Sequence, residues 1–370
     1  MKLRSNHNKI LFVIGSLGIG GAERQMLELK KLLNEIEIYP IILTYQSEAY
    51  DYPDSTEEKR VRISATNKYL LHLKIVLTIG KMKPDIVLAY GRKASVCSLI
   101  TSVFTLRRNC IVSERNHDSK YSFRTRLRFQ LYRKALKVVP NSWSQSGFIR
   151  THAPYLNSKV LTITNYTNPD RFSFKPKEKS ERLVVGIFAR YHVQKNTLGL
   201  LEAVRALGKY NAQLQFHWHG QKYLDGSDSA ELAEYYLQCE AVKEKYGLEN
   251  VYLNDFCNDV QLAFERCDAI CLPSFKEGFS NIISEAICCG KPILASSVSD
   301  NKILVRDGEN GFLFDPSNRD DMIKAFVRFS HLSQEELYAM QMRSRQIAES
   351  LFDKEAYVMK YLDALGLEYD

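Results

Sequence analysis

The segment PSFKEGFSNIISEAICCGKP, from Pro273 to Pro292, gives the clearest indication of how the chain folds. Buried-strand patterns precede it at 269–272 and follow it at 293–295, which predicts a loop and a helix joining two parallel strands. Ser280 can cap this helix, Gly290 can end it in a left-handed conformation, and the closing proline prevents its continuation. We therefore predict an α/β unit around this segment.

Two carboxylates stand out in this stretch, Glu277 in the loop and Glu285 on the helix. Glu285 is the only charge of the helix and lies away from its apolar face. The helix start offers backbone N–H groups and a positive dipole end, with Glu277 and Gly278 beside it. One interpretation is a phosphate-bearing ligand whose hydroxyls are bound by the carboxylates. The other is a solvated glutamate on an ordinary amphipathic helix. The apolar face consists of Ile282, Ile283, Ala286 and Ile287.

The composition is that of a globular protein long enough for two domains, with 370 residues, 45% of them hydrophobic and 25% charged. Eight cysteines lie scattered without a C-x-x-C pair, which predicts free thiols in a reducing compartment and neither a disulfide framework nor a zinc site. The D-x-D motif that usually holds a divalent metal against a nucleotide diphosphate does not occur. We therefore expect no metal and no cofactor.

We expect neither a signal peptide nor a transmembrane helix. The apolar run at 10–14 is too short for a signal peptide and is better explained as a first strand. The longest uncharged run, Ala94–Leu106, would span only about 20 Å as a helix, against a hydrocarbon core of roughly 30 Å.

Positive charge is concentrated in the first half of the chain. Residues 1–170 contain 27 Lys and Arg against 13 Asp and Glu, whereas residues 171–370 contain 24 against 30. The excess peaks between Leu106 and Lys137 and predicts an anionic partner, either a membrane surface, a polyphosphate or nucleic acid. The alternative is a solvated helix face. The basic residues of this stretch are Arg107, Arg108, Arg115, Lys120, Arg124, Arg126, Arg128, Arg133, Lys134 and Lys137, facing only Glu114 and Asp118.

Alternating strands and helices predict two α/β domains, both doubly wound parallel sheets of the Rossmann-like kind, facing a cleft. We expect the first domain at 1–168, the second at 169–350, and a C-terminal helix at 351–370 that packs back on the first domain. The predicted strands lie at 9–15, 37–44, 85–89, 110–114, 138–141 and 160–163, then at 183–188, 213–218, 250–254, 269–272, 293–295 and 311–314. The predicted helices include 22–33, 70–81 and 355–367.

Ligands of such sheets bind at the carboxyl ends of the strands. Gly20 and Gly21 form a glycine-rich turn there that does not fit G-x-G-x-x-G but lets the backbone approach a ligand. Arg190 and Lys195 follow a strand and could neutralise a diphosphate, or could be two surface cations. Other candidates at strand ends are His117, and Phe256 as a surface on which a base could stack.

Four motifs in order resemble those of the retaining, GT-B-fold glycosyltransferases of family 4. They are GGAER at 20–24, FARYHVQKN at 188–196, PSFKEGFSNIISEAICCGKPILAS at 273–296 and DGENGFLF at 307–314. The resemblance covers about Lys9 to Phe314. Two departures occur, Ala189 where glycine usually precedes the arginine, and Ser299-Asp300-Asn301 in place of a glycine pair.

The resemblance implies a nucleotide-diphosphate sugar bound mainly by the second domain. Arg190 and Lys195 would hold the diphosphate, Glu285 the ribose and Glu277 the sugar hydroxyls. The first domain would contribute Gly20 and Gly21 near the diphosphate and His117 near the transferred sugar. Backbone contacts would come from Gly278, Phe279, Ser280 and Asn281. Glu277 would position the donor, while the leaving phosphate accepts the acceptor's proton.

The leading hypothesis is a metal-independent, retaining hexosyltransferase that uses a UDP-sugar and a glycan or lipid-linked acceptor to build cell-surface polysaccharide or glycolipid. It would work in the cytoplasm, peripherally at the inner face of an anionic membrane. The alternatives are a nucleotide-sugar epimerase or phosphorylase of the same fold, and a nucleic-acid-binding protein that uses the basic segment. We expect no nucleic-acid partner, because no recognition motif occurs and aromatic residues are not regularly interleaved with the basic ones.

Overall fold

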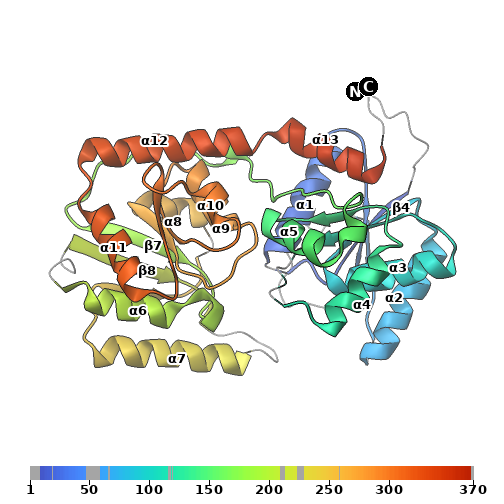
Figure 1. Cartoon of the computed structure of the whole chain (residues 1–370), viewed down its shortest axis with the longest axis horizontal. Coiled ribbons are helices and arrows are strands. Elements are labelled where there is room, and N and C mark those ends of the chain that lie inside the picture. Colours follow the sequence, from blue (N-terminus) through green and yellow to red (C-terminus); the bar gives the residue numbers. More distant parts are fainter. Residues whose placement is uncertain are drawn as a thin grey trace. The chain divides into compact units, whose positions relative to one another are not determined.

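The computed structural model describes residues 9–18, 20–46, 59–65, 67–115, 118, 120–208, 213–222, 229–257 and 259–367, which divide into two compact units (Figure 1). One unit contains the chain up to Tyr166 together with the segment from Lys354 onward. The other contains Thr167–Asp353. Each unit is built on a parallel six-stranded sheet.

The first sheet has the strand order β3-β2-β1-β4-β5-β6, with all neighbours parallel. The order reverses at β1, which makes the sheet doubly wound. Its strands are β1 (Ile10–Ile14), β2 (Ile41–Thr44), β3 (Arg60–Arg62), β4 (Ile86–Tyr90), β5 (Cys110–Glu114) and β6 (Val138–Pro140). Its helices are α1 (Gly21–Asn34), α2 (Lys68–Met82), α3 (Arg92–Phe104), α4 (Phe123–Tyr132), α5 (Trp143–His152) and α13 (Lys354–Leu365).

Helices cover both faces of this sheet (Figure 1). α2, α3 and α4 lie side by side on one face, and α1 and α13 lie together on the other. This arrangement follows from right-handed crossovers, because the chain moves one way from β1 to β3 and the opposite way from β3 to β6. Alternate strand residues such as Leu11, Val87 and Val112 pack against the α2–α4 layer through Ile75 and Phe129.

The second sheet has the strand order β12-β11-β10-β7-β8-β9, again entirely parallel. Its core is rich in aromatic residues, with Trp218, Phe216 and Phe326 fully buried. Its strands are β7 (Leu183–Phe188), β8 (Leu214–His219), β9 (Val251–Asn254), β10 (Ala269–Leu272), β11 (Ile293–Ser296) and β12 (Gly311–Phe314). Its helices are α6 (Thr197–Ala206), α7 (Ser229–Lys245), α8 (Val260–Arg266), α9 (Asn281–Cys288), α10 (Asn301–Leu304), α11 (Arg319–Ser330) and α12 (Gln334–Leu351).

Most predicted elements are confirmed, and three of the second sheet's strands have the predicted bounds. The larger errors lie in the first sheet, since the other strand bounds differ from the prediction by at most one residue. The predicted strand at 37–44 begins only at Ile41, because Glu37 adopts a left-handed backbone with φ 62°. The short strand β3 was not predicted. The predicted strand at 160–163 is reduced to a single bridge between Val138 and Val160.

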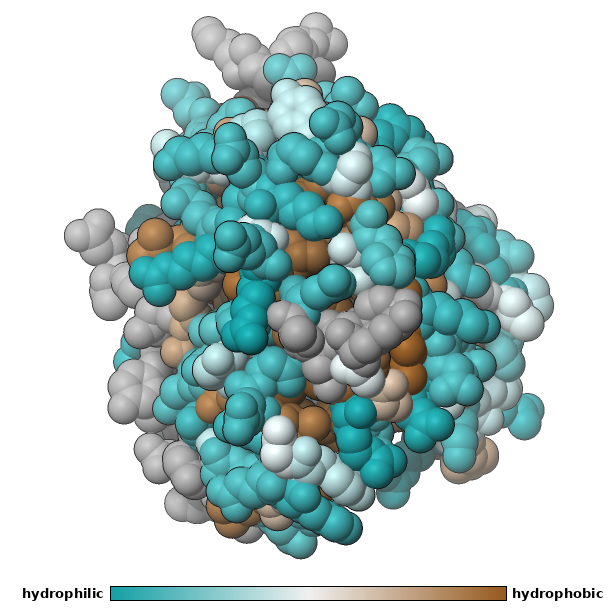
Figure 2. Space-filling view, turned by 90° about the vertical axis from the view of Figure 1, so that its left-hand side faces the viewer, coloured by the Kyte–Doolittle hydropathy of each residue, from teal (hydrophilic) through white to brown (hydrophobic). Residues whose placement is uncertain are grey.

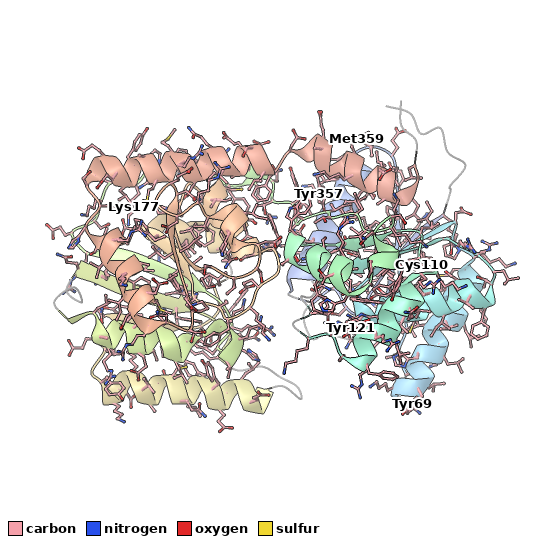
Figure 3. The ribbon with its side chains drawn as sticks, viewed as in Figure 1. Tyr69, Cys110, Tyr121, Lys177, Tyr357 and Met359 are labelled. Carbon is pink, nitrogen blue, oxygen red and sulfur yellow. The ribbon has the colours of Figure 1, made fainter. Side chains whose placement is uncertain are left out.

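The C-terminal helix α13 belongs to the first unit. Its buried face carries Tyr361, whose hydroxyl lies 3.3 Å from that of Tyr90, and Tyr357, whose ring stacks on Tyr166 at 5.0 Å. Met359 points away from this face and is exposed (Figure 3). The burial of these four tyrosines, two of them hydrogen-bonded to each other, explains why the end of the chain packs on the first unit.

Hydrophilic side chains cover most of the face seen in Figure 2, with smaller apolar areas between them. That face lies at the left of Figure 1. Within the described residues, every helix falls short of the length or apolar character that a membrane span requires.

Candidate active site

The loop after β7 is held in place by side chains on either side of Arg190. The carbonyl of Ala189 accepts a 2.7 Å hydrogen bond from the indole of Trp218, and the hydroxyl of Tyr191 donates to the Asn254 carbonyl at 2.7 Å. Arg190 itself is exposed, and it forms no ion pair within the described part of the chain. Its guanidinium is therefore available to a ligand at the carboxyl edge of the sheet.

Asn196 fixes the far end of this loop. Its backbone is left-handed with φ 61°, and its buried side-chain amide donates to the carbonyls of Pro273 at 3.2 Å and Pro316 at 3.1 Å. These carbonyls belong to the loops after β10 and β12. One side chain thus joins three loops at one edge of the sheet. Asn196 is not among the residues that the sequence alone predicts for the site, although asparagine is, after glycine, among the residues most tolerant of this backbone.

Lys195 and Glu277 meet across the two loops. The Lys195 ammonium lies 2.6 Å from a Glu277 carboxylate oxygen, and their side chains are 22% and 12% exposed. Gln194 joins the same loops through its backbone, because its carbonyl accepts from Phe275 N–H at 2.9 Å. Its side-chain amide also donates to the Lys276 carbonyl at 2.9 Å. The structure therefore brings together two of the predicted site residues, which lie 82 positions apart.

Helix α9 follows this loop as predicted. Ser280 caps it by accepting from Ile283 N–H at 3.4 Å, and Gly290 ends the segment with φ 68°. A side chain at Gly290 would place its Cβ 2.2 Å from the Phe174 ring. Gly290 is thus required for two reasons. Its backbone is left-handed, and the Phe174 ring leaves no room for a side chain.

Glu285 is buried, with 2% of its surface exposed. A carboxylate in such a place loses its hydration, so the interpretation of a solvated glutamate on the helix surface is wrong. Ser284, one position earlier, is also buried and donates to the Ser280 carbonyl at 2.8 Å. Two polar residues of α9 are therefore buried, as its apolar residues Ile283, Ala286 and Ile287 are.

The remaining candidates of the second unit take different positions. Phe279 is buried with its ring 6.3 Å from that of Phe352, so it can offer a ligand only its backbone, as expected. Gly278 and Asn281 are half-buried at the start of α9. Phe256 follows β9 and is 47% exposed, which leaves its ring accessible for stacking.

The segment Ser299-Asp300-Asn301, which stands where the resemblance predicts a glycine pair, contains a left-handed turn. Ser299 adopts φ 49°, a conformation that favours glycine. The side-chain amide of Asn301 donates to the Ser296 carbonyl at 2.9 Å and closes the turn before α10. A side-chain hydrogen bond thus stabilises a turn that glycines would otherwise permit.

In the first unit, Gly20 is extended with φ −155° and Gly21 begins α1. His117 lies outside the described residues. Its neighbour Asp118 is buried and accepts from Arg92 at 2.6 Å and from Gln145 at 3.0 Å.

Some basic residues of the segment from Leu106 to Lys137 form ion pairs or hydrogen bonds within the first unit. Arg128 is 10% exposed and contacts both Asp118 and Glu114, the latter at 3.3 Å. Burial raises the pKa of the Glu114 carboxyl, while Arg128 opposes that shift. Arg115 donates to Asn165 at 2.7 Å and lies over the Tyr90 ring. Arg115 and Arg128, two of the ten basic residues of this segment, therefore form contacts within the first unit.

Comparisons with known proteins agree with this architecture. Residues 182–331 match the family model described as Glycosyl transferases group 1. A Campylobacter jejuni protein, "GalNAc-alpha-(1->4)-GalNAc-alpha-(1->3)-diNAcBac-PP-undecaprenol alpha-1,4-N-acetyl-D-galactosaminyltransferase", is 24% identical over 321 residues, 82% of this chain and 84% of its own. An uncharacterized glycosyltransferase of Haemophilus influenzae is 37% identical over 94 residues, 25% of this chain and only 26% of that protein.

Solved structures show the same fold over nearly the whole chain. HepE of Anabaena, in complex with UDP and glucose, has a TM-score of 0.81 at 21% identity, covering 97% of this chain and 100% of its own. The lipopolysaccharide outer core galactosyltransferase WaaB has a TM-score of 0.72 at 16% identity, covering 97% and 99%. Two parallel six-stranded sheets with these neighbours define a GT-B fold, which confirms the predicted fold class. Residues 182–331 of the second unit are thus similar to the glycosyltransferase group 1 family, which agrees with the resemblance predicted from the sequence.

Proposed function

We propose that the protein transfers a sugar, with retention of configuration, from a UDP-sugar to a glycan or lipid-linked acceptor in the synthesis of cell-surface polysaccharide or glycolipid. The observation that carries this proposal is the contact between Lys195 and Glu277 at the carboxyl edge of the second sheet. A cation for phosphate and a carboxylate for sugar hydroxyls stand side by side there, beside the start of α9.

Related proteins support the choice of donor and acceptor. HepE structures are described in complex with UDP and with UDP-glucose. An Escherichia coli relative, 35% identical over 71 residues and 18% of its length, is named as a UDP-Gal:alpha-D-GlcNAc-diphosphoundecaprenol galactosyltransferase. The Campylobacter relative is likewise named for an undecaprenol-linked acceptor. We propose a UDP-sugar and a polyprenyl-diphosphate glycan as the first substrates to test.

In this proposal the second unit binds the donor. Arg190 and Lys195 hold the diphosphate, Glu277 accepts hydrogen bonds from the sugar, and Glu285 does so from the ribose. Backbone groups from Gly278 to Asn281 complete the sugar and phosphate contacts, and Phe256 lies against the base. From the first unit, Gly20 and Gly21 near the diphosphate and His117 near the sugar stay predictions from the family resemblance.

The proposed reaction requires positioning and charge stabilisation. The bond between C1 and the leaving diphosphate oxygen breaks as the acceptor oxygen bonds to C1 on the same face. The acceptor's hydroxyl proton passes to the leaving β-phosphate oxygen. Lys195 and Arg190 stabilise the negative charge that develops on that phosphate, so the proposal requires neither a metal nor a cofactor. Eight free thiols and this donor favour a cytoplasmic site of action.

Transfer from a panel of UDP-sugars to a synthetic undecaprenyl-diphosphate glycan tests the proposal. We expect acceptor-dependent release of UDP and a glycosylated lipid whose anomeric configuration, measured by NMR, is that of the donor. Lys195→Ala and Glu277→Ala should reduce transfer at least 100-fold, whereas Lys276→Ala, at an exposed neighbouring position, should not. Full activity in the folded Glu277 variant, or an epimerised nucleotide sugar as the sole product, would contradict it.

A further inference from the structure

The helices α2, α3 and α4 carry large apolar side chains on their outer surface. On α2, Tyr69, Leu73 and Leu77 are spaced four residues apart and form one exposed stripe, with Tyr69 85% exposed at its start (Figure 3). Phe104 at the end of α3 is 79% exposed, and Phe123 at the start of α4 is 72% exposed. Apolar side chains gathered on neighbouring helices usually mark a binding surface.

The α3 helix continues this surface between the other two. It contacts both α2 and α4. Its outward positions, Val96, Ile100 and Val103, are apolar and at least partly exposed. We call the residues of these two paragraphs, together with the exposed Leu127 of α4, the α2–α4 face.

The charges around this face are almost all positive. Residues 59–137 contain 19 Lys and Arg and only three acidic residues. Two of the three, Glu114 and Asp118, are buried in the contacts with Arg128, and the third, Asp85, is half-buried and accepts from Lys9 N–H. The exposed cations of the three helices and their ends include Lys68, Lys74, Lys81, Lys83, Arg92, Arg107, Arg108, Arg124, Arg126, Arg133 and Lys134.

We infer that the α2–α4 face docks on the surface of an anionic lipid bilayer. Lysine and arginine bind the headgroups, while leucine and aromatic side chains enter the boundary between headgroups and acyl chains. This surface meets both requirements at once. This inference concerns membrane binding and not the transfer of sugar. It assigns the anionic partner predicted from the sequence to a bilayer, and its binding surface to one face of the first unit.

Two other occupants fit less well. Nucleic acid would match the charge, and its bases could stack on the exposed rings of Tyr69, Phe104 and Phe123. It would leave the exposed leucines, Leu73, Leu77 and Leu127, without an apolar partner. A second copy of the chain would match the apolar residues but would bring two positive faces together. Only an anionic bilayer matches both the charge and the apolar side chains.

Sedimentation with phosphatidylcholine vesicles, with or without 30% phosphatidylglycerol, tests this inference on the full chain. We expect binding to the anionic vesicles only, weakened by salt. Arg124→Ser/Arg126→Ser should lower the partition coefficient roughly 25-fold, about five-fold for each charge. Leu73→Ser/Leu77→Ser should also weaken binding at least ten-fold. Matched changes on the second unit, Lys302→Ser/Lys324→Ser and Leu237→Ser, should have no effect.

Equal binding to neutral vesicles, absence of binding at 150 mM salt, or unchanged binding of the two α2–α4 variants would overturn the inference. So would preferential binding to a DNA duplex added in competition. Circular dichroism of every variant distinguishes lost docking from lost folding. The assay needs neither donor nor acceptor, so a negative result leaves the proposed transfer untouched.

Discussion

Replacement of Asn196 tests how the loop of Lys195 is held. Its amide donates to two carbonyls in a buried place, and its backbone is left-handed. Aspartate has the same shape but carries a carboxylate oxygen where asparagine has its amide nitrogen. This oxygen is an acceptor, and it would lie against two carbonyl oxygens that are also acceptors. Alanine removes the donor and adds backbone strain. Glycine removes the donor and relieves the strain.

The expected losses of unfolding free energy follow from these contacts. Loss of the two hydrogen bonds, one to the buried Pro273 carbonyl and one to the partly buried Pro316 carbonyl, costs about 2 kcal/mol, counting about 1 kcal/mol for each. A left-handed alanine adds roughly 1 kcal/mol. We therefore expect about 2 kcal/mol for Asn196→Gly, about 3 kcal/mol for Asn196→Ala and at least as much for Asn196→Asp. Transfer should fall in the same order, because Lys195 is the adjacent residue.

Urea unfolding followed by tryptophan fluorescence measures these changes. Trp218 is buried in the second unit, and Trp143 in the first unit is exposed. A Trp143→Phe background therefore makes the signal report the second unit. Gln238→Ala, which removes an exposed amide from α7, is the control and should change stability by less than about 0.5 kcal/mol. An Asn196→Asp variant as stable as this control would refute the reasoning.

Three further predictions follow. Gly290→Ala should destabilise by about 2–4 kcal/mol in urea, because φ is 68° and Cβ would strike the Phe174 ring; a neutral effect would contradict the tight ending of α9. Burial lowers the pKa of His217 from its ordinary 6.5, so the native state resists protonation and loses stability as the pH falls below 6.5. His217→Phe should reduce the difference between melts at pH 7.5 and 5.5, and an unchanged difference would exclude this histidine. Only the half-buried Cys257 should react with a thiol reagent at pH 8, since burial raises the pKa of thiols such as Cys97 to about 11; reaction of several native thiols would contradict this.

The strands that the sequence predicted best are buried over most or all of their length. β10 and β12 are continuous apolar runs between turn residues, a pattern that depends on the local sequence alone. β3 was missed because it is an edge strand of Arg60, Val61 and Arg62, whose residues are half-buried or exposed. Its pairing with β2 creates the strand, and no local pattern reveals that pairing.

The sequence could name residues of the candidate site, but it could not predict the contacts that hold them in place. Lys195 and Glu277 could be named from strand ends and a family resemblance, and the structure brings them into contact. Asn196 could not be assigned a role, because its partners lie 77 and 120 positions away in the chain. Arg128 is mostly buried because it contacts the buried Glu114. The number of charges in the sequence does not reveal this contact.

The most direct test of the central claim is the dissociation constant of UDP and of the active UDP-sugar, measured by calorimetry for three variants. Lys195→Ala should weaken both ligands roughly 10–150-fold, the value of a charge-assisted hydrogen bond of 1.5–3 kcal/mol. Glu277→Gln should weaken only the UDP-sugar, because its partner would be the sugar, and Lys276→Ala should change neither constant. Equal weakening of UDP and UDP-sugar by Glu277→Gln, or unchanged binding of both by Lys195→Ala, would contradict the proposed donor site.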